Sequence, residues 1–296
     1  RSSGLLDRVE RSLFDAGLSF VELGGVSPNP KISLVRKGVA LCRREGLDFV
    51  LAVGGGSVID SAKAIAMGAA TGRDPWEFAS TGTRPDKTLP VATVLTLAAS
   101  GSETSNSCVL TNEETKEKRG ITSETNRPVI SFLDPENTFT VSKFQTGCGI
   151  VDIMMHTLER YLTPEGGESD LTDRIAEGLL IAVRDAGRRA IADPRDYEAR
   201  ATLMWAGSVS HNDYTGCGRK RLFPVHKLEH ELSAFRDEIA HGAGLSVLFP
   251  AWAEHEMPYD YPRFAQFANR VLGVEMDFEH PERTAREGIR TLRRFF

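Results

Sequence analysis

An aspartate and a histidine four positions apart, Asp152 and His156, are the first residues of this chain whose spacing suits chemistry. Apolar residues at positions 151, 154, 155, 158 and 162 recur at helical spacing and predict a largely buried amphipathic helix. On one face of that helix, the carboxylate and the imidazole lie about 6 Å apart, close enough for both to bind one divalent metal. An Asp–His hydrogen bond that only supports the helix fits the same spacing. A metal site therefore needs further histidines.

Those histidines lie in the stretch 226–242, which holds three of the seven in the chain: His226, His230 and His241. A continuous helix would place His241 about 22 Å beyond His226. If both bind one metal, the helix must end near Arg236–Asp237 and the chain must fold back. The pair at 152 and 156 and two further histidines would supply three or four nitrogen and oxygen ligands. This set is typical of Fe(II) or Zn(II) rather than Mg or Ca.

Composition places the chain among ordinary globular proteins. Its 296 residues predict about two domains, and a formal net charge of −5 gives no reason to expect nucleic acid or an anionic membrane as a partner. The four cysteines are scattered without a C-x-x-C pair, which indicates reduced thiols in the cytoplasm. No long apolar run or signal peptide is visible. The sequence begins without Met and ends inside an Arg-rich helical pattern, so we expect an incomplete stretch of a longer protein.

Residues 1–145 alternate helical and strand patterns and predict an α/β domain with a parallel, Rossmann-like sheet. The continuous apolar run at 48–53 is typical of a strand buried on both faces. The expected helices are 5–13, 32–44 and 58–70, and the expected strands are 19–23, 48–53, 89–97 and 129–133. Residues 111–118 have the composition of a charged hairpin turn.

The glycine loop Gly54–Ser57 follows the strand at 48–53 and opens a helix. Glycines allow close approach of the backbone, and the first-turn N–H groups and the helix dipole favour a phosphate. The loop is neither G-x-G-x-x-G nor a Walker A motif, and a capping box of Ser57 and Asp60 fits it equally well. A second small-residue loop, 99–107, follows the next strand. Both loops would line the carboxyl edge of the sheet, the usual crevice for a nucleotide.

From Val141 onward, strand patterns disappear, and 146–296 predicts an all-helical domain that opens with the Asp152 helix. That helix would lie beside the strand edges of the first domain. A metal would then face a nucleotide across an interdomain cleft, where the active site is expected. The helical runs are 149–162, 170–191, 197–209, 226–235, 243–256, 262–272 and 282–296.

These motifs, in their order, resemble the iron-dependent (group III) alcohol dehydrogenases. The shared motifs are Gly54-Gly55-Gly56-Ser57-x-x-Asp60-x-x-Lys63, Ser100-Gly101-Ser102-Glu103, Asp152-x-x-x-His156, His226-x-x-x-His230 and His241-Gly242. The stretches H-x-x-E-H-E-L-S-A and D-I-M-M-H are most similar to the butanol dehydrogenase and aldehyde reductase branch. The resemblance covers essentially the whole chain, and members of the family are longer at both ends.

The resemblance implies hydride transfer between NAD or NADP and a small alcohol or aldehyde, by a cytoplasmic homodimer holding one Fe(II) or Zn(II). It implies that His230 faces the substrate and is catalytic without binding the metal. It implies four metal ligands, Asp152, His156, His226 and His241, and eight cofactor-binding residues, Gly54, Gly55, Gly56, Ser57, Asp60, Thr96, Ser100 and Lys118. His226 and His241 are fifteen apart, one more than is usual in the family. The residue that selects NAD or NADP lies outside this chain.

Three other interpretations stay open. H-x-x-E-H at 226–230 matches the inverted zinc-protease motif, with Glu229 as base, but leaves the Asp152 pair and both loops unexplained. A non-redox, metal- and NAD-dependent lyase similar to dehydroquinate synthase would share the nucleotide loop and the metal. Against it, no Lys and Arg cluster is evident near the metal helix. A metal-free binding protein would follow if the extra residue displaced His241. His211 has no partner at metal spacing.

Overall fold

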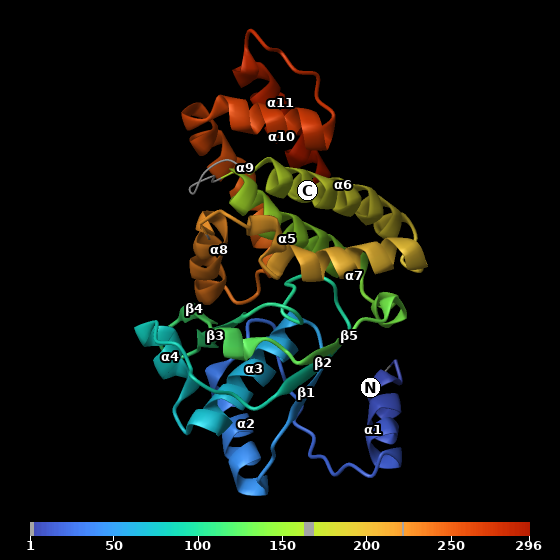
Figure 1. Ribbon diagram of the computed structural model, residues 1–296, viewed down its shortest axis with the longest axis vertical. Coiled ribbons are helices and arrows are strands. Elements are labelled where there is room, and N and C mark those ends of the chain that lie inside the picture. The colour runs from blue at the N-terminus through green and yellow to red at the C-terminus, as the bar shows by residue number, and fades with distance from the viewer. Residues whose placement is uncertain (1–2, 163–168, 221) are drawn as a thin grey trace.

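The computed structural model describes residues 3–162, 169–220 and 222–296. Figure 1 shows a sheet-containing part and a helical part stacked along the long axis of the molecule. The sheet part ends with strand β5 (Ile130–Phe132) and the short 3-10 helix η2 (Pro135–Thr138), and helix α5 (Lys143–Leu162) opens the helical part. This is the predicted fold: a parallel sheet with helices, followed by a largely helical region.

The parallel sheet has the strand order β1-β2-β5, with β1 at Val50–Gly54 and β2 at Val91–Leu95. Val50 pairs with Val91 and Ala92 pairs with Ile130. Every residue of β2 is buried, as its apolar run predicts for a central strand. Helix α3 (Gly56–Thr71) packs against β1, and α2 (Ile32–Glu45) packs against α3. Both β1 and β2 end at one sheet edge, where the two predicted loops begin.

A hairpin stands beside the sheet, formed by β3 (Ser107–Asn112) and β4 (Glu117–Thr122). The predicted charged turn lies at its tip, where Lys116 adopts a positive φ of 57°. Helix α4 (Pro75–Thr81) contacts this hairpin and is capped by Asp74, whose side chain accepts a hydrogen bond from the Trp76 amide. The remaining elements of this part are α1 (Leu5–Asp15) and the 3-10 helix η1 (Glu124–Asn126).

The strand expected at Ser19–Leu23 is wrong. These residues carry no regular secondary structure, and Phe20 and Val21 are 44 % and 46 % exposed. No strand of the described ranges lies alongside to accept their backbone hydrogen bonds. Alternating apolar residues suggested a strand, but an extended segment becomes one only when a neighbour satisfies its N–H and C=O groups.

Helix α5 is the centre of the helical part and packs against three of its other helices, and its residues Ile153, Met154, Met155 and Leu158 are fully buried. No described helix is long and apolar enough to cross a membrane. The other helices are α6 (Asp170–Ala192), α7 (Tyr197–His211), α8 (Pro224–Phe235), α9 (His241–Glu256), α10 (Tyr261–Leu272) and α11 (Pro281–Phe295), with 3-10 turns η3 (Tyr214–Gly216) and η4 (Met257–Tyr259).

Two glycines bring the elements of the two parts into close contact. A Cβ at Gly149 of α5 would lie 2.2 Å from the Ala98 carbonyl oxygen, in the loop after β2. A Cβ at Gly242 of α9 would lie 2.2 Å from the Cys148 carbonyl oxygen of α5. Any side chain at either position would overlap backbone. The start of α5 therefore lies directly over the end of β2, and the start of α9 lies directly against α5.

Candidate functional site

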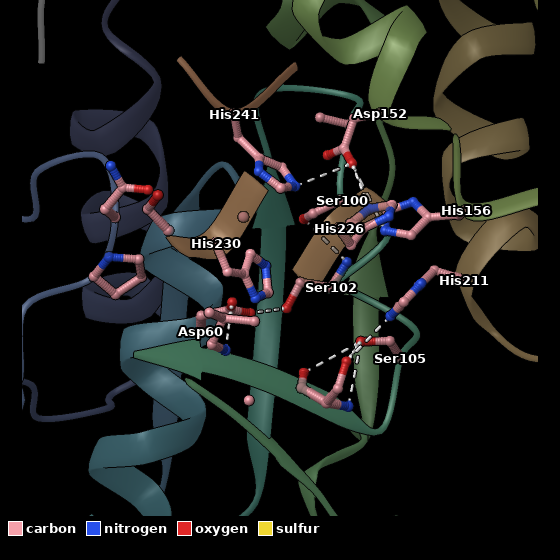
Figure 2. A pocket seen from close by; sticks show the side chains of 18 of the residues that line it. Asp60, Ser100, Ser102, Ser105, Asp152, His156, His211, His226, His230 and His241 are labelled. Carbon is pink, nitrogen blue, oxygen red and sulfur yellow. Dashed lines mark hydrogen bonds and ion pairs between the residues drawn. The ribbon is translucent and has the colours of Figure 1, made fainter. Parts of the chain in front are cut away.

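A cleft of about 1040 Å³ lies between the sheet part and the helical part. Its walls come from the loops after β1 and β2, the hairpin, and helices α5, α8 and α9 (Figure 2). All five residues assigned to metal or catalysis line it. Of the eight assigned to the cofactor, Gly56, Ser57, Asp60, Ser100 and Lys118 line the cleft, whereas Gly54, Gly55 and Thr96 stand behind its surface.

An aspartate and three histidines converge at one end of the cleft (Figure 2). Asp152 Oδ1 lies 3.7 Å from His156 Nε2, 3.5 Å from His226 Nε2 and 3.7 Å from His241 Nε2. The chain folds back as the spacing required, since α8 ends at Phe235 and α9 begins at His241. The extra residue in the turn does not carry His241 away from the other three.

The geometry of this cluster suits a shared cation. Two ligands at about 2.1 Å from a tetrahedral metal are about 3.4 Å apart, close to the separations around Asp152 Oδ1. Asp152 Oδ1 and His226 Nε2 are buried and have no hydrogen-bond partner among the described residues. Buried polar atoms without a partner are costly unless a ligand satisfies them. Ligand atoms of Asp152, His156 and His226 all lie within 4.8 Å of one another, and those of His241 lie within 4.8 Å of Glu229 and His230. The first three residues therefore fit one Fe(II) or Zn(II) ion, and His241, whose Nε2 is 3.7 Å from Asp152 Oδ1, lies beside them as the fourth predicted ligand.

Two fully buried glutamates, Glu159 and Glu229, orient two of the rings. His226 Nδ1 hydrogen-bonds to Glu159 and His241 Nδ1 to Glu229, which leaves each Nε2 facing Asp152. Glu159 also accepts the backbone N–H of Val225 at 2.5 Å, at the start of α8. Glu159 was not predicted from the sequence as part of the site. Glu229 was predicted only as the base of a protease, yet its carboxylate hydrogen-bonds to His241 Nδ1.

Charge around the cluster favours a cation. Burial lowers the pKa of His226, but the carboxylates of Glu159 and Asp152 raise it more, to about 9. The pKa of His156 lies well below its ordinary value, because the ring is buried and has other histidines beside it. The cluster thus combines a neutral imidazole with an environment that stabilises positive charge.

His230 and His211 complete the histidine lining of the cleft. The His230 ring centroid lies 5.6 Å from that of His241, and burial lowers the pKa of His230 well below its ordinary value. His211, for which the sequence showed no partner at metal spacing, lies beside one of the predicted ligands. Its ring lies 4.1 Å from that of His156, and its Nε2 is 3.1 Å from Ser107 Oγ. Because the two histidines are 55 positions apart in sequence, their spacing gave no signal of this contact.

The glycine loop fits against the loop after β2. A Cβ at Gly55 would lie 3.1 Å from Leu97 Cβ, and one at Gly56 would lie 2.3 Å from Ser100 Oγ. The Thr96 amide donates to the Gly54 carbonyl at 3.1 Å. The glycines therefore serve close approach, since none of the three has a positive φ. The two loops form one continuous wall of the cleft.

The predicted capping box does not form. The N-cap of α3 is Gly55, and no side-chain capping hydrogen bond is made to the first-turn N–H groups of this helix. Asp60 instead accepts from Ser102 Oγ at 2.5 Å and from the Val109 amide at 2.9 Å. The first turn of α3 meets the cleft at Gly56 and Ser57 without a capping side chain. It therefore retains the anion-binding character expected of a helix N-terminus next to glycines.

Several known proteins are similar to this chain over most of its length. A family model described as iron-containing alcohol dehydrogenase matches residues 1–135, and one described as the C-terminal part of the Fe-containing alcohol dehydrogenase family matches residues 146–296. NADH-dependent butanol dehydrogenase A of Clostridium acetobutylicum is 41 % identical over all of this chain and 76 % of its own length. NADPH-dependent aldehyde reductase YqhD of Escherichia coli is 35 % identical over 93 % of this chain and 70 % of its own. The crystal structure of NADH-dependent butanol dehydrogenase A from Thermotoga maritima superposes with a TM-score of 0.95 at 39 % identity, covering 99 % of this chain and 73 % of that one.

Proposed function

Because the chain belongs to the iron-containing alcohol dehydrogenase family, we propose that it interconverts small alcohols and aldehydes by hydride transfer with NAD or NADP. The observation that supports this proposal is the convergence of the four predicted metal ligands at one end of a cleft whose wall is a glycine-rich, uncapped helix start. One end fits a metal and the substrate oxygen. The wall fits a dinucleotide.

Asp152, His156, His226 and His241 would hold the metal. When bound, Fe(II) or Zn(II) supplies Lewis-acid polarisation of the substrate oxygen. One carboxylate and three neutral imidazoles would leave a divalent ion with a net positive charge, and the buried Glu159 and Glu229 keep two of the rings aimed at Asp152. The protein thus fixes the charge of the site and the orientation of its imidazole rings before substrate enters.

The proposed cofactor residues divide into two groups by position. Gly56, Ser57, Asp60, Ser100 and Lys118 line the cleft and would contact the dinucleotide. Gly54, Gly55 and Thr96 lie behind them and shape the loop through backbone contact. In this arrangement, the protein aligns the nicotinamide ring with the substrate carbon and excludes water from the hydride path.

His230 is the proposed catalytic residue that does not bind metal. Its imidazole lines the cleft beside His241 and is neutral at physiological pH, because burial lowers its pKa well below the ordinary value. A neutral imidazole here can relay the alcohol proton toward solvent. His230→Ala should lower turnover and leave bound metal unchanged. Loss of metal from this variant would reassign His230 as a ligand.

The experiment that tests the function is metal analysis of the purified protein together with NADH and NADPH oxidation on a panel of short aldehydes. We expect one equivalent of iron or zinc and oxidation of at least one cofactor. Protein without stoichiometric metal that oxidises neither cofactor would reject the dehydrogenase function.

A zinc protease is disfavoured by the position of Glu229, whose carboxylate contacts His241 Nδ1 and Lys118 behind the cluster.

Two further predictions concern the assembly and its location. A homodimer formed through the sheet part is supported by the exposure of Val129, Ile130 and Phe132, which are 63 %, 55 % and 56 % exposed at β5. Apolar side chains gathered in this way are typical of an interface. Light scattering of the purified protein tests the dimer. A cytoplasmic location is supported by the four free cysteines.

A further inference from the structure

A buried lysine of the sheet part contacts the helix that carries two of the site histidines. Lys118 lies in β4, and its side chain is 5 % exposed. Its ammonium donates to Asn29 Oδ1 at 2.9 Å and to Ser233 Oγ of α8 at 2.9 Å, and it lies 3.5 Å from Glu229 Oε2 of α8. An ammonium has three N–H groups, and each therefore has an acceptor in this network.

The carboxylate of Glu229 connects Lys118 to the metal cluster. The same oxygen, Oε2, hydrogen-bonds to His241 Nδ1 and accepts from Ser233 Oγ at 3.4 Å. A Cβ at Gly244 of α9 would lie 2.8 Å from Glu229 Cγ, so α9 packs closely on this side chain. A fully buried carboxylate is stable only with a nearby positive charge or hydrogen-bond donors. Lys118 supplies that charge from the other part of the molecule.

The backbone before His241 is also held by the sheet part. Asp237, in the turn between α8 and α9, accepts from Lys31 Nζ at 2.5 Å and from Asn29 Nδ2 at 3.0 Å. Asn29 thus contacts Lys118 through its oxygen and Asp237 through its nitrogen. The sheet part therefore constrains both the ring of His241, through Lys118 and Glu229, and the turn that leads to it.

We propose that Glu229 and Lys118 are positioning residues for the metal, Glu229 by holding His241 Nε2 toward Asp152 and Lys118 by holding Glu229 in place. This inference rests on the proposed function, because it takes the cluster to be a metal site. It adds that metal affinity depends on a contact between the two parts of the molecule. An oriented, hydrogen-bonded imidazole loses less freedom on binding a metal than a free one.

The test measures Zn²⁺ affinity of the metal-stripped, nucleotide-free protein by competition with a chelator. We expect Glu229→Gln to weaken Zn²⁺ binding about 10- to 100-fold, as the loss of a carboxylate behind a ligating histidine does. Lys118→Met should weaken it about 10-fold. Glu231→Gln, on the exposed side of the same helix, and Lys116→Met, at the exposed tip of the same hairpin, are matched controls and should bind like the parent.

A variant that combines Glu229→Gln with Lys118→Met tests whether Lys118 acts through Glu229 or affects Zn²⁺ binding independently. If Lys118 acts through Glu229, the double variant binds Zn²⁺ no more weakly than Glu229→Gln alone. Additive losses, or Glu229→Gln with parental affinity, would overturn the proposal. Should a charge variant fail to fold, Ser233→Ala decides the matter. It removes one hydroxyl that contacts both partners, and unchanged affinity would then reject the network.

The parent protein distinguishes failure of this inference from failure of the proposed function. A parent that binds no Zn²⁺ refutes the metal site itself. A parent that binds one equivalent tightly, with an unaffected Glu229→Gln variant, refutes only the positioning role.

Discussion

Replacing Gly242 by alanine tests whether the site depends on close contact between α5 and α9. A Cβ at this position would lie 2.2 Å from the carbonyl oxygen of Cys148 and 2.6 Å from its carbonyl carbon and its Cα. All three are backbone atoms of a buried helix, so no side-chain rotation relieves the overlap. To reach ordinary contact at 3.4 Å, the two helices must separate by about 1.2 Å at this point.

A displacement of this size exceeds what the distance between a metal and its ligand can tolerate. His241 immediately precedes Gly242, and metal–ligand distances tolerate about 0.2 Å. We therefore expect His241 to leave the cluster and Zn²⁺ affinity to fall about 10- to 100-fold. Overpacking at the same contact should lower the free energy of unfolding of the metal-free protein by about 1–3 kcal/mol.

Gly147→Ala is the matched control, because Gly147 lies one residue before Cys148 in α5 and a Cβ there meets nothing within 4 Å. Alanine in a helix interior is favoured over glycine by about 1 kcal/mol, so this variant should be neutral or slightly more stable. Urea unfolding of the metal-free proteins and chelator competition measure both quantities. A Gly242→Ala variant with the stability and Zn²⁺ affinity of the parent would refute the close contact and the role assigned to it.

Three further predictions follow from other contacts. Gly56→Ala should weaken NADH binding in a fluorescence titration without changing bound metal, because its Cβ would lie 2.3 Å from Ser100 Oγ in the wall of the cleft. Asp173→Asn should lower the free energy of unfolding by about 1–3 kcal/mol at neutral pH. Burial raises the pKa of Asp173, but Arg263 and Arg219 lower it more, to a net value below the ordinary one. The stability from this ionised group is complete above its unfolded pKa and is lost as pH falls through the folded pKa, so the difference from the parent in urea unfolding should shrink in acid. Removal of metal by a chelator should abolish turnover and lower the melting temperature, and Fe²⁺ or Zn²⁺ should restore both. An unchanged melting temperature would contradict a structural contribution of the metal.

Hydrophobic periodicity and turn-forming residues predicted most helices and strands of this fold, because these elements form where the local pattern places them. The helical run at 149–162 lies within α5, and the turn required near Arg236 lies between α8 and α9. The failures share one cause. A strand at 19–23 needed a neighbour, and the capping box at Ser57 needed Asp60, which hydrogen-bonds to Ser102 and Val109 instead. In both cases, distant parts of the chain decided the outcome, and a local pattern has no information about them.

The difference between local patterns and contacts from distant parts of the chain also explains why the metal ligands were predicted and the glutamates that orient them were not. The apolar positions of α5 predicted one buried face, and two other positions of the helix, Asp152 and His156, were predicted to hold metal ligands. Asp152, His156 and Glu159 in fact recur at helical spacing as a second stripe, and all three are buried, because α8 and α9 cover the face that an ordinary amphipathic helix leaves to solvent. Burial of ionisable side chains is costly unless each has a partner. A stripe of such residues on a buried helix therefore indicates a ligand site together with its own hydrogen-bonding support. By this reasoning, Glu159 belongs to the metal site as much as His226, whose ring it orients.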